Sequence, residues 1–215
     1  MSRLRAQIAV AFLLCAGASA PALNPPTPLT PLILNGSGLS GAASALAAPG
    51  QSASAQSAPP DGAAQATATM QTFTSADGRF SVLLPGTPKQ ETQQVSLQGG
   101  GASTLYEFSV DLENDNVTYM VMYNDYPANY ANEAPQTTLA RTRDGAAKDK
   151  TLTSDTAIDL NGVPGRAFTL TDKDGWLYSV HQFLNGKRLY QLIEVNSKDH
   201  PATLTDQFMN SFRMF

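Results

Sequence analysis

Two side chains in the C-terminal half of the chain, Ser179 and His181, have residue types that could perform hydrolysis. They are two positions apart in an alternating run, so on a β-strand they would project side by side from one face. A serine beside a histidine is the nucleophile and base of many hydrolases. Their positions on the strand lie roughly 6–7 Å apart and the side chains point in parallel, which does not favour the directed hydrogen bond that a nucleophile needs. We therefore expect a structural histidine and keep a small hydrolase as an alternative.

Three alternating carboxylates, Asp111, Glu113 and Asp115, are spaced like the first ligands of a calcium loop. Asn116 stands where that loop requires glycine, and Met122 stands where it requires the bidentate glutamate. These differences exclude an EF-hand. A metal-binding protein remains a second alternative, which requires the three carboxylates to converge on one point. We assign no metal and no other cofactor.

Two tyrosines, Tyr126 and Tyr130, fall in a segment rich in proline, asparagine and alanine that should form a loop. A tyrosine on a loop adds a large rigid contact area with a polar tip, which suits a ligand or partner. The alternative is that both rings fold back over the sheet as part of the core. We predict Tyr126 and Tyr130 as ligand-binding or partner-binding residues.

The elements that must position these side chains are antiparallel strands. After Met70, alternating apolar and polar residues are interrupted by dipeptides that supply the positive φ angles of tight turns. These dipeptides are Asp77-Gly78, Asn161-Gly162, Asp174-Gly175 and Asn185-Gly186. The last of them predicts a hairpin between residues 176–184 and 188–195.

One strand, residues 117–123, is apolar on both of its faces and so requires cover on both. Two helices are available for this, over residues 135–148 and 201–211. The second has Leu204, Phe208 and Phe212 at helical spacing. The sequence thus predicts an α+β fold, in which a central antiparallel sheet is sandwiched by helices.

Three segments of the chain have a recognisable pattern: residues 73–86 (FTSADGRFSVLLPG), residues 160–166 (LNGVPGR) and residues 208–213 (FMNSFR). They resemble bacterial secreted proteins with a PsbP-like fold. The resemblance covers residues 71–215. It implies a sheet sandwiched by helices and a role that is mostly non-catalytic, as in assembly factors and envelope lipoproteins. Some members bind metals, but their ligands do not match positions here.

The first 69 residues have the order expected of an export signal followed by a tether. Residues 1–18 contain two arginines, a short apolar run and small residues, which is typical of a signal peptide cleaved after Ala18. A lipoprotein anchored through Cys15 is less favoured because Leu14 precedes it. Residues 19–69 are too poor in apolar and aromatic side chains to pack, so we expect a disordered tether and no transmembrane anchor. The domain is expected over residues 70–215.

Charge narrows the choice of partner. From Met70 onward the chain has 17 acidic and 12 basic residues, a net charge of −5, with no cluster of Lys and Arg. This argues against nucleic acid, whose phosphates are bound by clustered cations. The sequence therefore favours an exported, non-catalytic binding or assembly module of the cell envelope, whose partner is an envelope protein or a small ligand.

Overall fold

The computed structural model describes residues 68–96, 101–128 and 133–215. The predicted signal peptide, almost all of the predicted tether, and Tyr130 lie outside these ranges. Within them, neither helix has the length and apolar character needed to span a membrane.

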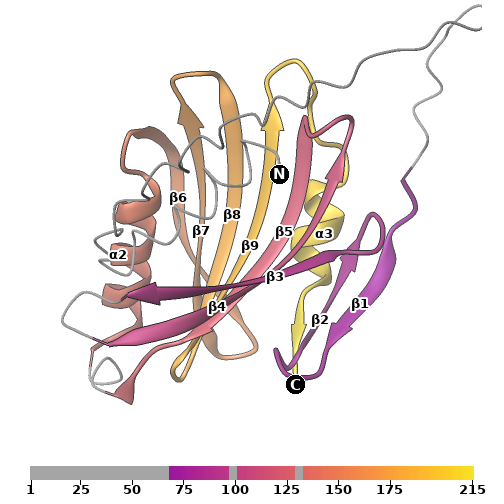
Figure 1. The fold of residues 1–215 in the computed structure, drawn as a ribbon. Helices are drawn as coiled ribbons and strands as arrows, with labels where there is room; N and C mark the ends of the chain where they lie inside the picture. Colours follow the sequence, from indigo (N-terminus) through magenta and orange to yellow (C-terminus); the bar gives the residue numbers. More distant parts are fainter. Residues whose placement is uncertain (1–67, 97–100, 129–132) are drawn as a thin grey trace, which may run out of the picture. The chain divides into compact units, whose positions relative to one another are not determined.

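Ten strands and two helices make up the described part of the chain, and the strands form two antiparallel sheets (Figure 1). The strands are β1 (Gln71–Ser75), β2 (Phe80–Leu84), β3 (Lys89–Ser96), β4 (Ala102–Leu112), β5 (Val117–Asp125), β6 (Lys150–Leu160), β7 (Val163–Asp172), β8 (Trp176–Asn185), β9 (Arg188–Ser197) and β10 (Arg213–Met214). The helices are α2 (Pro135–Ala146) and α3 (Thr205–Ser211). The large sheet has the order β3-β4-β5-β9-β8-β7-β6, and the small sheet the order β1-β2-β10.

The predicted turns join the strands as expected. The hairpin of β8 and β9 is confirmed, with Asn185 paired with Arg188 across Gly186, whose φ is +61°. In the turn between β6 and β7 both Asn161 and Gly162 have positive φ, as a tight hairpin requires. Four consecutive strands at one side of the large sheet are therefore joined by short turns, and their register is fixed by local sequence.

The strand predicted to be apolar on both faces is β5, and it is buried along all but its last residue. Met120 and Met122 lie in the hydrophobic cluster that includes α2, through Leu139 and Ala146. Tyr119, Val121 and Tyr123 lie in the second cluster. That cluster also contains residues of α3 and of β2, so the large sheet is packed on both faces.

The prediction of an α+β fold, with the central sheet sandwiched by helices, is wrong. The described chain is mostly β-structure, and its helices contain only 12 and 7 residues. One face is covered by α2, whereas the other is covered by β2 of the small sheet together with α3. The physical reason lies in β2, where Phe80, Val82 and Leu84 alternate inward and are 0–1 % exposed. A strand therefore covers much of the sheet face on which we expected a helix.

Candidate functional site

A continuous row of oxygen-bearing side chains crosses five strands on the face of the large sheet that packs against α3. The register pairs Ser154 of β6 with Thr169 of β7, Thr169 with Ser179 of β8, Ser179 with Glu194 of β9, and Glu194 with Tyr119 of β5. Because directly paired residues point to the same face, these five side chains are neighbours. We call this set the oxygen row. It leads from the exposed strand β6 to the buried centre of the sheet.

A cavity of about 250 Å³ lies between the oxygen row and α3, and we call it the α3 pocket. The sheet contributes Ser154, Thr169, Ser179 and His181, and α3 contributes Thr205, Asp206 and Asn210. Nearly every polar group here is a hydroxyl, amide or carboxylate. The rest of the lining includes the apolar residues Ala167, Phe168, Val180 and Met209. The pocket therefore combines apolar walls with several groups that can accept hydrogen bonds.

Glu194 is the most perturbed group next to this pocket. It is 1 % exposed, and burial raises the pKa of its carboxyl from 4.5 to about 7. The hydroxyls of Ser179 and Thr205 face the carboxylate and offset part of that rise by hydrogen bonding. Among the described residues, its Oε1 has no hydrogen-bond partner. A carboxyl that titrates near neutral pH beside a pocket is a common mark of a functional site.

Tyr119 closes the buried end of the oxygen row. Its hydroxyl accepts the backbone N–H of Leu204 at 3.3 Å, just before α3 begins. Burial raises the pKa of this phenol to about 12, so it stays protonated at physiological pH. Its ring contacts Phe208 edge-on with centroids 5.5 Å apart. The end of the row and the start of α3 are thus held together by one residue.

Ser179 and His181, the predicted hydrolase pair, both line the α3 pocket, but they do not form the bond that hydrolysis requires. Ser179 is paired with Glu194 across β8 and β9, and the described contacts include no hydrogen bond between Ser179 and His181. Burial lowers the pKa of the His181 imidazole, and the nearby charge of Asp206 opposes that shift only in part. His181 is therefore neutral at neutral pH, with its ring edge-on to Phe183.

Tyr126, one of the two predicted binding residues, is 6 % exposed and lies in the hydrophobic cluster that contains α2. Its backbone N–H donates to the carbonyl of Lys187 at 2.8 Å. In this structure its ring contributes to the core, as the alternative considered for it required. Tyr130 lies outside the described residues, so the two tyrosines cannot be placed together.

The three carboxylates of the metal alternative have separate surroundings. Asp111 accepts a hydrogen bond from the Thr118 hydroxyl at 2.8 Å, and Glu113 pairs with His200 at 2.9 Å. Asp115 lies in a turn in which it and the two preceding residues have positive φ. In the described ranges no three His, Cys, Asp or Glu side chains are arranged to hold a metal ion.

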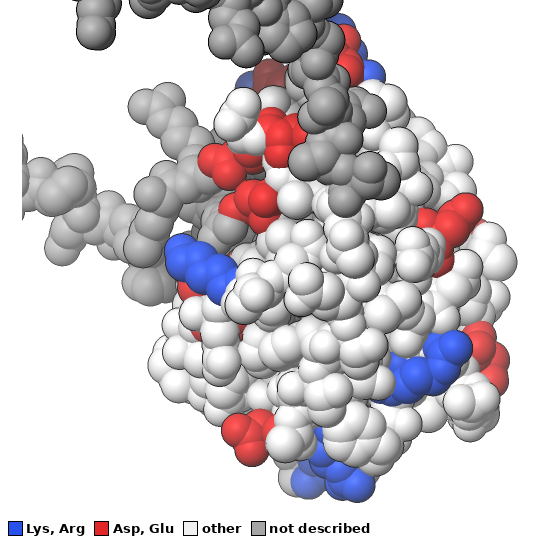
Figure 2. Space-filling view, turned by 90° about the vertical axis from the view of Figure 1, so that its right-hand side faces the viewer, with Lys and Arg blue, Asp and Glu red and all other residues white. Residues whose placement is uncertain are grey.

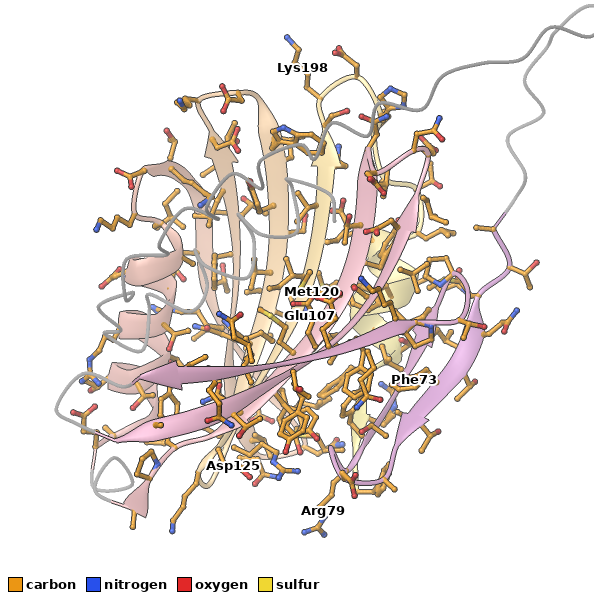
Figure 3. All side chains as sticks on the ribbon, in the orientation of Figure 1. Phe73, Arg79, Glu107, Met120, Asp125 and Lys198 are labelled. Atoms are coloured by element: carbon orange, nitrogen blue, oxygen red, sulfur yellow. The ribbon has the colours of Figure 1, made fainter. Side chains whose placement is uncertain are left out.

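A larger cavity of about 460 Å³ lies at the end of the sheet where Arg79 and Asp125 are found (Figure 3). Two arginines line it, but both already make intramolecular contacts. Arg188 binds Asp125 through two hydrogen bonds of 2.7 Å and also donates to the carbonyl of Asp77. Arg79 donates to the carbonyl of Phe215 at 3.1 Å. Arg188 thus joins the large sheet to the turn between β1 and β2, and Arg79 joins that turn to the residue after β10. Because both cations already have partners, the α3 pocket is the better candidate for a ligand site.

No protein-family model and no curated protein matches this chain. Among solved structures, cyanobacterial PsbP from Synechocystis sp. PCC 6803 matches with a TM-score of 0.45 and 14% identity, over 75% of this chain and 99% of that chain. A protein of unknown function from Pseudomonas aeruginosa matches with a TM-score of 0.32 and 10% identity, over 64% of this chain and 87% of that one. A protein from Bacteroides thetaiotaomicron matches with a TM-score of 0.34 and 12% identity, over 67% of this chain and 48% of that one.

The match to PsbP agrees with the PsbP-like resemblance of the sequence motifs. All three TM-scores are below 0.5, and we infer nothing about function from them.

Sequence reasoning missed Glu194 and the row that it belongs to. A signal was present, because Glu194 interrupts a strand whose residues are apolar on both parities, from Leu189 to Val195. A charged residue at such a position is buried and rarely without a role. Its neighbours in the row come from other strands, however, and their alignment depends on registers that a single strand does not reveal.

Proposed function

We propose that this chain is an exported, non-catalytic binding module of the cell envelope, and that it holds a small polar ligand in the α3 pocket. The observation that carries this proposal is one cavity of about 250 Å³ that is lined both by the oxygen row and by α3. The row contributes Ser154, Thr169 and Ser179, and α3 contributes Thr205, Asp206 and Asn210. Small-ligand sites are cavities in which a few convergent polar groups fix the ligand's orientation. The buried, unpartnered Oε1 of Glu194 next to the cavity supports the same reading.

The hydrolase alternative has less support at this site. The alternative requires the imidazole of His181 to accept the proton of Ser179, and among the described residues no hydrogen bond joins these two side chains.

Export is supported by the order of residues 1–18 alone, and it has its own test. We expect the mature protein, purified from cell envelopes and mapped by mass spectrometry, to begin at Ser19, because the small residues before it fit signal cleavage. A lipid-modified N-terminus at Cys15 would support the lipoprotein alternative. A cytoplasmic protein that retains residues 1–18 would contradict export.

Ligand binding can be tested by NMR titration of the full chain with small polar probes of different charge. The probes are 1,4-diaminobutane, 1,4-butanediol, glucose and acetate. We expect at least one cationic or neutral probe to shift the amide signals of Ser179, Thr205 and Asp206 saturably, because these residues line the pocket. Ser179→Leu should abolish the shifts by filling the pocket, and Asp199→Asn, on an exposed loop, should not change them.

Two results would oppose the proposal. If no probe perturbs the pocket signals at millimolar concentration, the α3 pocket is not a ligand site. If a model ester is hydrolysed, and Ser179→Ala and His181→Ala each abolish this while the fold is retained, the hydrolase alternative holds instead.

A further inference from the structure

The α3 pocket has an uneven balance of charge. Among the described residues that line it there is no Lys or Arg, while Asp206 contributes a carboxylate and a second one, Glu194, lies just behind the lining. The domain as a whole is acidic, with a net charge of −5 from Met70 onward. On the face shown in Figure 2, charged side chains form small separate groups on a largely uncharged surface. Nothing at the pocket offsets its negative charge, so an anionic ligand would be repelled.

The hydroxyls between the pocket and Glu194 can relay a hydrogen bond. Ser179 and Thr205 both line the cavity and both face the buried carboxylate. Each hydroxyl has one proton to donate and lone pairs with which to accept. If each donates its proton to Glu194, its oxygen is left as an acceptor toward the cavity. A ligand that binds to these acceptors must have several hydrogen-bond donors.

The Oε1 atom of Glu194 also indicates that the ligand is a hydrogen-bond donor. Oε1 has no partner among the described residues, although the side chain is 1 % exposed. An ionised carboxylate in such a place is stabilised by a positive charge close by, and none is supplied by the residues around the pocket. The missing charge is therefore one that a ligand can supply.

We propose that the α3 pocket binds a small protonated amine, whose ammonium donates to the hydroxyls of Ser179 and Thr205 and is balanced by Asp206 and Glu194. This inference rests on the proposed binding function and specifies the charge of the ligand. An ammonium group has three donors and no acceptor, which matches a site rich in acceptors. A neutral polyol could satisfy the hydroxyls, but it would leave both carboxylates without a counter-charge.

The proposal predicts that binding strengthens as the pH rises. The groups that face Glu194 are Ser179 of β8, Tyr119 of β5 and Thr205, the first residue of α3. The other ionisable groups of the pocket are His181 and Asp206. An ammonium stabilises the ionised carboxylate and so lowers its pKa from about 7. Binding then releases a proton from Glu194, and affinity rises as that proton is lost.

The test compares two probes with the same four-carbon chain, 1,4-diaminobutane with ammonium ends and 1,4-butanediol with neutral hydroxyl ends. Each is titrated into the full chain and followed by the amide signals of the pocket. We expect the diamine to bind at least about tenfold more tightly than the diol, since its hydrogen bonds are charge-assisted. Its affinity should rise about tenfold between about pH 6 and about pH 8, where the ionised fraction of Glu194 rises and an alkylammonium stays protonated.

The variants separate the roles of the ionisable groups. Glu194→Gln should abolish the pH dependence, and Asp206→Asn should weaken the diamine about tenfold with little effect on the diol. His181→Ala should retain the pH dependence, and Asp199→Asn serves as the matched control for a lost exposed carboxylate.

Equal binding of the diol and the diamine would overturn this inference and leave the proposed binding function standing. Diamine binding that survives both Asp206→Asn and Ser179→Leu would place the amine elsewhere and also overturn it. A pH dependence that disappears in His181→Ala would assign the proton to the imidazole and reject the role of Glu194. Absence of binding by every probe would reject the proposed function itself.

Discussion

At about pH 8, Glu194→Gln should be more stable than the natural protein by roughly 3 kcal/mol. The natural carboxyl is 1 % exposed, and burial raises its pKa from 4.5 to about 7 in the folded state. Above pH 7 folding must therefore bury a carboxylate, whereas the variant buries a neutral amide of the same shape. The free energy of unfolding, measured by urea denaturation at several pH values, tests this.

The direction in which the free energy of unfolding changes with pH follows from the number of protons that each state binds. Between about pH 4.5 and about pH 7 the folded state of the natural protein binds more protons at Glu194 than the unfolded state does, so stability falls as the pH rises through this window. Below it, both states are protonated and the contribution of the group to stability is fully present. The variant lacks this titration, so the two proteins should be similar near pH 4.5 and diverge toward pH 8.

Asp199→Asn is the matched control, because it removes an exposed carboxylate from the loop after β9. Its stability should follow that of the natural protein at every pH, within about 0.5 kcal/mol. If Glu194→Gln is no more stable than this control at about pH 8, the carboxyl is not held in the desolvated state described above.

Phe208→Ala should destabilise the domain by about 3–5 kcal/mol, the usual cost of removing a buried phenylalanine. Phe208 is 0 % exposed, packs edge-on against Tyr119 and anchors α3 to the large sheet. Because α3 has only seven residues, it gains little from its own hydrogen bonds and depends on this packing. Urea denaturation gives the stability, and the amide signals of Thr205 and Asp206 report whether α3 stays docked.

Phe215→Ala provides the comparison, since the same side chain at position 215 is 59 % exposed. Its removal should lower the free energy of unfolding by less than about 0.5 kcal/mol. An equal loss of stability in both variants would contradict the conclusion that the buried face of α3 holds this wall of the α3 pocket in place.

The hairpins and the doubly buried strand were predictable because their causes are local. Asn161-Gly162 and Asn185-Gly186 set turn geometry directly, and the apolar residues of β5 reveal burial on two faces. By contrast, β3 is nearly devoid of apolar residues along Lys89–Ser96 and gave no periodic signal. It lies at an edge of the large sheet, where its strand structure comes from pairing with β4.

The candidate site was predictable only in part, because it depends on contacts between distant segments. Ser179 and His181 were recognised from their spacing, and both do line the pocket. The direction of the Ser179 hydroxyl depends on Glu194 and Thr205, which belong to other elements. Tyr126 was assigned to a loop surface from its neighbours in sequence, whereas its burial comes from the cluster around α2.

The contacts of β2 with the C-terminal segment, both α3 and β10, have a consequence for the order of folding. Ser211, at the end of α3, accepts the backbone N–H of Leu83 of β2 at 2.8 Å, although the two residues are 128 positions apart in the chain. Contacts of such long range must close a large loop and therefore form late. The small sheet cannot be completed until the last residues of the domain have been synthesised. We therefore expect the large sheet to form first, with β2 left unpaired on one side until the segment that contains β10 arrives.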